Sequence, residues 1–176
     1  MKKIVLPAVA VIAVALALIG YANRPEWRWE LPADMPPPQV PADNPMSAAK
    51  VELGRWLFYD QRLSGNGSMS CATCHIQALA FTDGKPRSIG STGEIHPRSA
   101  MSLVNVAYAS RLTWANPLLD RLEDQALTPL LGDRPVEMGL RHGEQRVSAL
   151  LRVESHYSEL AGRAFPDDAD PHSLLN

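Results

Sequence analysis

Two cysteines and a histidine lie within one five-residue string, Cys71-Ala-Thr-Cys74-His75, and the chain has no other cysteine. Cysteines three positions apart project from the same side of a helical turn, which matches the separation of the two vinyl groups of haem. The adjacent imidazole is then placed to ligate the iron. The string predicts one covalently attached c-type haem, with Cys71 and Cys74 as the thioether residues and His75 as the axial metal ligand.

A Cys-x-x-Cys pair also has two other uses, a thioredoxin-type redox centre and half of a zinc site. The redox centre is typical of a βαβ context, and strand-like alternation is scarce along this chain. A structural zinc site commonly takes four ligands and a second cysteine pair, which this sequence lacks. The full string therefore favours haem over both alternatives.

The N-terminus has the features of an export signal. Lys2 and Lys3 precede an uncharged apolar run over residues 4–20, and Gly20-Tyr21-Ala22 has the small-x-small pattern of signal peptidase sites. We predict a signal peptide over residues 1–22, with an uncleaved membrane anchor as the alternative. Export would place the chain in the periplasm, where covalent haem attachment occurs. The predicted location therefore agrees with the cysteine string.

Composition excludes several other classes of protein. The chain has 176 residues, which fits one domain, and its formal net charge of −2 offers no basic surplus for nucleic acid. Residues 23–45 are rich in proline, which removes backbone donors and fixes φ, so we predict a linker that is an extended spacer or a strap over the domain surface. A membrane contact is expected only through an uncleaved N-terminal anchor.

The elements that must position the haem residues are short helices. Apolar residues recur at helical spacing over five segments, and a polar, glycine-bearing loop over 60–70 leads into the cysteine string. Residues 46–176 are therefore predicted to form an all-α domain built around haem. The predicted helices run from an Asn44 cap and Pro45 to Asp60, over 101–109, from an Asn116 cap and Pro117 to just before Pro129, over 144–152 and over 155–165.

The residues around the cysteine string resemble the N-terminal haem domain of bacterial di-haem cytochrome c peroxidases and MauG-type enzymes. The resemblance covers about residues 46–165 and implies a cytochrome c-like haem domain. It is carried by Leu53-Gly-Arg-Trp-Leu-Phe-Tyr-Asp-Gln-Arg-Leu-Ser-Gly-Asn-Gly67, Ser70-Cys-Ala-Thr-Cys-His75, Ala80-Phe-Thr-Asp-Gly84, Ser102-Leu-Val-Asn-Val-Ala-Tyr108, Leu122-Glu-Asp-Gln-Ala126 and Pro135-Val-Glu-Met-Gly139.

The resemblance implies roles for two further residues. Trp114 matches the tryptophan that lies between the two haems of the family and helps electrons pass; the alternative is an ordinary core aromatic. Glu137 matches the distal carboxylate that moves a proton between the oxygens of bound peroxide; the alternative is a surface glutamate.

Some positions depart from the family pattern. Ser99 stands where many members place an Asn that helps to hold a calcium ion, which argues against calcium here. The string His96-Pro-Arg-Ser99, with a longer spacing from Pro129 to Glu137, resembles a subgroup associated with methanobactin operons, whose di-haem enzymes oxidise a tryptophan on a partner protein. The family has a second haem domain, and no second Cys-x-x-Cys-His follows here, so we expect the sequence to be a fragment.

Two functions from different classes follow. In the first, the protein is a peroxidase-type enzyme that reduces hydrogen peroxide, or uses it to oxidise a protein partner, with a small redox protein as donor. In the second, it is a mono-haem electron carrier without catalysis. The sixth iron ligand would discriminate between them. Its candidates are the histidines and methionines outside the string: His96, His142, His156, His172, Met69, Met101 and Met138.

Overall fold

The computed structural model describes residues 27–114, 116–141 and 143–166. Residues from Leu31 onward belong to one compact unit, while residues 27–30 belong to another, in which the rings of Trp27 and Trp29 meet edge to face with centroids 5.7 Å apart. The predicted signal peptide or anchor over 1–22 lies outside the described residues. Within them, no helix is long and apolar enough to cross a membrane.

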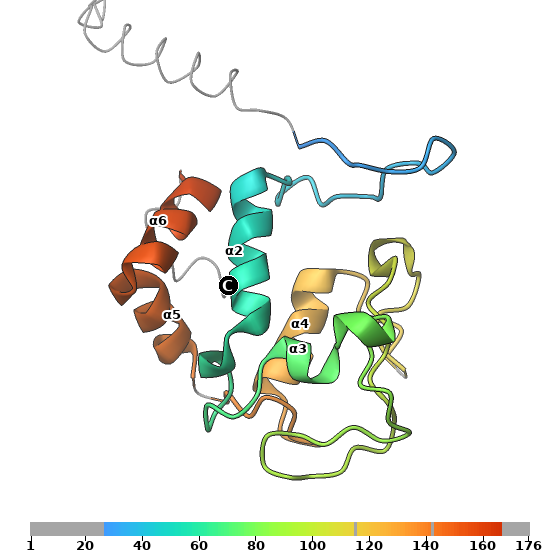
Figure 1. Ribbon diagram of the computed structural model, residues 1–176, viewed down its shortest axis with the longest axis vertical. Coiled ribbons are helices and arrows are strands. Elements are labelled where there is room, and N and C mark those ends of the chain that lie inside the picture. Colours follow the sequence, from blue (N-terminus) through green and yellow to red (C-terminus); the bar gives the residue numbers. More distant parts are fainter. Residues whose placement is uncertain (1–26, 115, 142, 167–176) are drawn as a thin grey trace, which may run out of the picture. The chain divides into compact units, whose positions relative to one another are not determined.

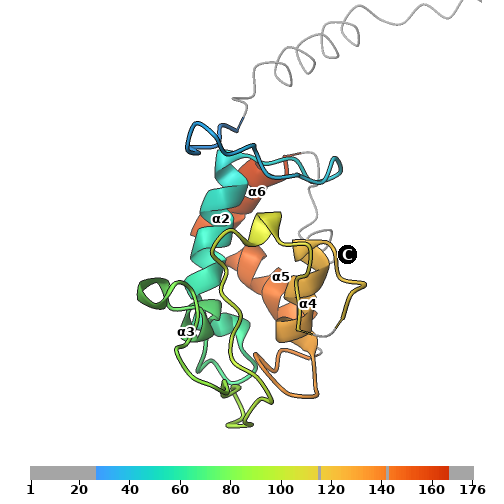
Figure 2. The same cartoon turned by 90° about the vertical axis from the view of Figure 1, so that its right-hand side faces the viewer.

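The compact unit is built from helices and loops, which confirms the all-α expectation (Figures 1 and 2). In the described ranges there is no named strand, and β pairing is confined to three isolated bridges. The elements are α2 (Ala48–Tyr59), η1 (Gln61–Leu63), α3 (Cys71–Cys74), η2 (Gln77–Leu79), η3 (Val106–Tyr108), α4 (Leu122–Leu131), α5 (Glu144–Val153) and α6 (Ser155–Ala164), where η marks a 3-10 helix.

The hydrophobic core lies where α2 packs against α6 and α6 against α5. Leu53 of α2, Leu151 of α5 and Leu160 of α6 are almost completely buried there. Burying a leucine side chain contributes about 1.5–3 kcal/mol, so these contacts are a main source of stability. The helices predicted over 144–152 and 155–165 are confirmed within a residue at each end.

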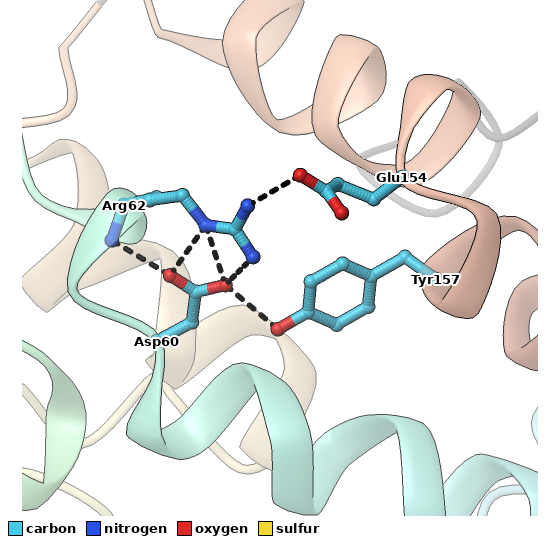
Figure 3. A network of polar contacts seen from close by, with 4 residues as sticks. All are labelled: Asp60, Arg62, Glu154 and Tyr157. Atoms are coloured by element: carbon cyan, nitrogen blue, oxygen red, sulfur yellow. Dashed lines mark hydrogen bonds and ion pairs between the residues drawn. The ribbon is translucent and has the colours of Figure 1, made fainter.

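A polar network joins the end of α2 to α6 (Figure 3). The Asp60 carboxylate accepts hydrogen bonds from the Tyr157 hydroxyl at 2.7 Å and from the Arg62 guanidinium at 2.8 Å. Arg62 Nη1 also pairs with Glu154 at 2.8 Å. Burial would raise the pKa of Asp60, but these donors outweigh it and hold the pKa below its usual value. The carboxylate therefore ties two helices together in its charged form.

Helix α2 begins later than predicted, because Ser47 rather than Asn44 is its N-cap. The Ser47 hydroxyl accepts from the Lys50 amide at 3.2 Å. The Asn44 side chain is engaged elsewhere, since it accepts from Lys50 Nζ at 2.7 Å and donates to Glu123 at 2.8 Å. The predicted end at Asp60 is confirmed.

Helix α4 differs from the prediction at both ends. It begins at Leu122, because the Asn116 side chain caps a local turn by accepting from the Leu118 amide at 3.0 Å. It continues through Pro129 to Leu131, although proline removes a helical hydrogen bond. The last carbonyls of an α-helix have no partner within the helix. In α4 the Pro129 carbonyl accepts from the Met138 amide and the Leu130 carbonyl from the Leu140 amide, each at 2.9 Å.

Two other segments also depart from the simple pattern. The helix predicted over 101–109 is only the 3-10 turn η3, because Asn105 has a left-handed backbone with φ of 55°. The proline-rich segment follows the unit's surface from Leu31: Pro36 accepts from the Tyr108 hydroxyl at 2.7 Å, and Asp43 pairs with Arg121 at 2.9 Å.

Candidate haem site

The cysteine string forms the short helix α3, held by the polar loop before it. The loop turns around Ser64, which is fully buried; its hydroxyl donates to the Gln61 carbonyl at 2.9 Å and accepts from the Met69 amide at 3.1 Å. Ser70 precedes α3, and its amide donates to the Thr73 hydroxyl at 3.0 Å. The two cysteine positions are thus set by a braced loop rather than by a long helix.

Cys71 and Cys74 are free thiols, both half-buried. Burial raises the pKa of Cys71, and burial together with the carboxylates of Asp83 and Glu137 raises the pKa of Cys74 to about 11. A redox-active cysteine needs the opposite, a pKa lowered toward neutrality so that the thiolate forms. The environment therefore argues against the thioredoxin-type alternative.

The His75 ring is oriented by a backbone carbonyl. Its Nδ1 lies 2.9 Å from the Phe81 carbonyl oxygen, and because a carbonyl only accepts, Nδ1 carries the proton. Nε2 is then left with a lone pair for a metal ion, and such outer hydrogen bonds are typical of metal-ligating histidines. No pattern in the sequence indicates this contact, which the turn after the string provides.

That turn is held in a strained backbone conformation. Ala80 and Phe81 have φ of 54° and 56°, a left-handed conformation that side chains other than glycine rarely adopt. Backbone hydrogen bonds from Phe81 to Ile76 at 2.9 Å and from Ile76 to Thr82 at 3.0 Å close the turn. Two consecutive left-handed residues bring the Phe81 carbonyl back to His75. No sequence signal marks them, since neither is glycine or asparagine.

An apolar cavity of about 240 Å³ lies beside Cys71. Its lining is almost wholly hydrocarbon and comes from α2, α4, α5 and the loops between them: Gly54, Leu57, Phe58, Leu63, Cys71, Leu127, Leu130, Leu131, Leu140 and Val147. A haem offers a large apolar face, which such a wall would cover. Two free thiols, an imidazole with an available nitrogen and an apolar wall together fit a c-type haem.

Glu137 lies in a backbone segment that packs against two other loops. Its carbonyl accepts from the Ser91 amide at 2.8 Å, and the next carbonyl, of Met138, accepts from the Gly65 amide at 2.8 Å. The side chain is half-buried, and burial raises its pKa against the opposing fields of His96 and His75. Glu137 is therefore a partly buried carboxyl whose charge acts on Cys74 and whose pKa His75 acts to lower.

Trp114 lies at the surface of the described unit. Its side chain is half exposed, its Nε1 donates to the Ser99 carbonyl at 3.1 Å, and the Arg98 guanidinium lies 5.4 Å from the ring centre. A ring in this position is not the core aromatic of the alternative reading. A fixed, exposed indole is suited to contact with another protein surface.

The candidates for the sixth iron ligand are dispersed. Met69 and Met138 are buried in the hydrophobic core, Met101 is half-buried, and His156 meets the Trp56 ring edge to face on α6. The His96 ring contacts a backbone carbonyl through Nε2. His142 and His172 lie outside the described residues. In the part of the chain that the structure describes, no three His, Cys, Asp or Glu residues gather as a metal site.

The chain is similar to known proteins in both sequence and fold. The family described as "Di-haem cytochrome c peroxidase" matches residues 48–176. Cytochrome-c peroxidase IdrP1 of Denitromonas iodatirespirans is 40% identical over 158 residues, which cover 86% of this chain and 40% of the relative. Methylamine utilization protein MauG of Methylophilus methylotrophus is 33% identical over 145 residues, which cover 82% of this chain and 41% of the relative.

The fold is shared with a solved structure of a MauG-like protein associated with microbial copper homeostasis. The two superpose with a TM-score of 0.79 at 48% identity, over 85% of this chain and 43% of the other. This chain therefore spans about two fifths of the length of the relatives that it matches.

Proposed function

This chain belongs to the di-haem cytochrome c peroxidase family, and we propose that it forms the exported haem domain at which hydrogen peroxide is reduced or is used to oxidise a protein partner. The observation that carries the proposal is the pairing of a haem-attachment string with a half-buried carboxyl, Glu137, whose pKa responds to His75. An electron carrier needs the string alone. A peroxidase needs the carboxyl as well.

Cys71 and Cys74 would hold the haem through thioether bonds, and His75 would ligate its iron through Nε2. The iron supplies the reversible electron transfer that peroxide reduction requires. The chain's own contribution is to fix the imidazole through the Phe81 carbonyl, which raises the basicity of the ligand. The apolar wall beside Cys71 excludes water from one side of the site.

Glu137 is the proton carrier of the proposal. Reduction of hydrogen peroxide to two water molecules consumes two protons and two electrons, and breaking the O–O bond needs a base for one oxygen and an acid for the other. A carboxyl whose pKa is raised by burial approaches the range in which it can accept a proton and return it. Glu137 would therefore take the proton from one peroxide oxygen and deliver it to the oxygen that leaves.

Trp114 would relay electrons between this domain and a second haem domain, which the family description implies. Its half-exposed ring, fixed by Ser99 and Arg98, supports contact with another surface. The electrons would come from a small redox protein or from the protein that is oxidised. The similar structure associated with copper homeostasis, together with His96-Pro-Arg-Ser99, supports a protein substrate in a copper-related system.

The test is Glu137→Gln in the full-length, haem-loaded protein. Glutamine keeps the size and the hydrogen bonds of the side chain but cannot carry the proton, so peroxide turnover should fall by about 10²–10⁴-fold. The matched control is Glu159→Gln on α6, where the side chain is exposed and pairs with Arg163 at 3.8 Å. Turnover is measured with hydrogen peroxide and a reduced donor, and haem content by pyridine haemochrome.

The control should retain wild-type turnover, and both variants should retain one haem on Cys71 and Cys74. Wild-type turnover in Glu137→Gln would remove Glu137 from the mechanism. An absorption spectrum that stays unchanged when peroxide or cyanide is added to the wild-type protein would contradict the peroxidase and support the electron carrier.

A further inference from the structure

The backbone around Glu137 is clamped by a turn from another part of the chain. Residues 88–96, called the clamp turn below, double back on themselves: the His96 amide donates to Ser88 at 2.8 Å and the Gly90 amide to Glu94 at 2.9 Å. The Ser91 amide of this turn donates to the Glu137 carbonyl at 2.8 Å. A segment about 45 positions away in sequence thus holds the residue proposed to carry the proton.

Both backbone polar groups of Val136, the residue before Glu137, are held by side chains of the clamp turn. The Val136 amide donates to Glu94 Oε2 at 3.1 Å, and the Val136 carbonyl lies 3.1 Å from His96 Nε2. The approach is close, because a Cβ added at Gly90 would lie 1.8 Å from the Val136 oxygen. The clamp turn therefore leaves the backbone at 136 and 137 little freedom to move.

The contact between His96 and Val136 shows which ring nitrogen of His96 carries a hydrogen. A carbonyl oxygen only accepts, so His96 Nε2 carries a hydrogen and donates it to Val136. The histidine is buried, with 8% of its surface exposed, and such a group is rarely placed without a partner. Its Nε2 is thus engaged by the protein, which removes the nitrogen that most often serves as an iron ligand.

We infer that His96 is a positioning residue for Glu137: its Nε2–H holds the Val136 carbonyl, and so fixes the carboxyl for proton transfer. The inference rests on the proposed function and adds a residue to it. Positioning matters because a displacement of about 1 Å at a reacting group costs roughly 10²-fold in rate. His96 and Glu94 together hold the carbonyl and the amide of Val136, and they supply that precision from side chains that need not touch peroxide.

The experiment compares His96→Leu with His96→Gln in the full-length, haem-loaded protein. Glutamine Nε2 reaches about as far as histidine Nε2 and donates a hydrogen bond, whereas leucine does not. His96→Leu should lower kcat for peroxide by about 10²-fold at an unchanged KM, and His96→Gln should stay within about threefold of wild type. Glu159→Gln, the exposed α6 variant already used as a control, should leave kcat unchanged.

A second readout does not depend on turnover. Amide hydrogen exchange is followed by mass spectrometry over residues 133–141 of the haem-loaded protein. Loss of one buried hydrogen bond should speed exchange in His96→Leu by about fivefold to tenfold, while His96→Gln exchanges like wild type. His96→Asn, whose donor is retracted by one bond, should lie between them and serves if the leucine variant does not retain haem.

A double variant separates positioning from a merely structural effect. If His96 acts through Glu137, His96→Leu combined with Glu137→Gln should be within about threefold of Glu137→Gln alone. Multiplicative losses would overturn the inference, as would unchanged hydrogen exchange in His96→Leu. Wild-type turnover in Glu137→Gln with faster exchange in His96→Leu would remove Glu137 from the mechanism and overturn the catalytic part of this inference, leaving only the clamp.

Discussion

The helical region and the site loops of this protein are held together in different ways. The helical region consists of α2, α5 and α6, and it contains buried leucines and the polar network around Asp60. The site loops, residues 64–121 and 132–143, contain the haem-attachment string, Trp114 and Glu137. They expose large apolar side chains such as Ile95 and Leu118. Packing stabilises the first region, and backbone hydrogen bonds position the second.

This difference indicates that the two regions depend on different interactions for their structure. A region with its own core keeps its shape without a ligand. Loops that expose many large apolar side chains, and that reach the core through a few residues such as Met138 and Leu140, need a partner to fix them. For the site loops that partner is expected to be the haem. Substitutions that change stability without changing activity, or that remove the haem, therefore test this difference between the helical region and the site loops.

The largest effect is expected from Cys71→Ala with Cys74→Ala, which would remove both of the proposed thioether attachments of haem. The site loops should lose protection from hydrogen exchange throughout, and the far-ultraviolet circular dichroism should show a partly unfolded chain. The helical region should keep more protection, because buried leucines of α2, α5 and α6 form its core. Cys74 is only partly buried against that core. A native-like spectrum with protected site loops would contradict the comparison.

Next in size is Leu160→Ala in the helical region. Leu160 is 3% exposed, so the substitution leaves a cavity and should lower the free energy of unfolding by about 2–5 kcal/mol. Turnover per folded molecule should not change. The matched control is Leu118→Ala in the site loops, where the side chain is 84% exposed and the change should stay within about 0.5 kcal/mol. Denaturant unfolding of both variants measures the contrast.

Tyr157→Phe tests the polar network of the helical region. The hydroxyl donates to the charged Asp60, so its removal should cost about 1.5–3 kcal/mol at neutral pH. Burial and the Asp60 carboxylate raise the pKa of Tyr157 to about 12, above the value near 10 of an unfolded tyrosine.

The raised pKa gives the same residue a signature in the pH dependence of stability. From about pH 10 to about 12 the unfolded chain has lost the tyrosine proton while the folded chain keeps it. The wild-type protein should therefore lose part of the Tyr157 stabilisation as pH rises through this window, and below pH 10 this contribution should be constant. Tyr157→Phe should lack this loss in unfolding curves recorded at each pH.

The smallest effect is expected from Ala80→Gly in the turn that orients His75. Glycine adopts a φ of 54° without strain, so the substitution should raise the free energy of unfolding by about 0.5–1 kcal/mol. The control is Ala149→Gly, exposed and within α5, which should lower it by a similar amount. Equal and opposite shifts would sharpen the contrast between a loop held in strain and an unstrained helix.

Local patterns in the sequence predicted the helical region well. The periodicity of 144–152 and 155–165 and the end of α2 at Asp60 need only apolar spacing and short-range capping. The haem-attachment string is equally local, since its residues are neighbours. The starts of α2 and α4 were misplaced, because Asn44 and Asn116 each had a competing use for the side chain.

The sequence by itself therefore predicted the helices that form the core and the haem-attachment string, both of which depend on residues within a few positions of one another. The tertiary structure decided how the site is arranged: the left-handed pair at Ala80 and Phe81 that orients His75, and the contact of His96 with Val136 behind Glu137. These contacts join residues up to 40 positions apart through backbone atoms. Because every residue type has the same carbonyl and nearly every one the same amide, no pattern of side chains reveals which of them will meet.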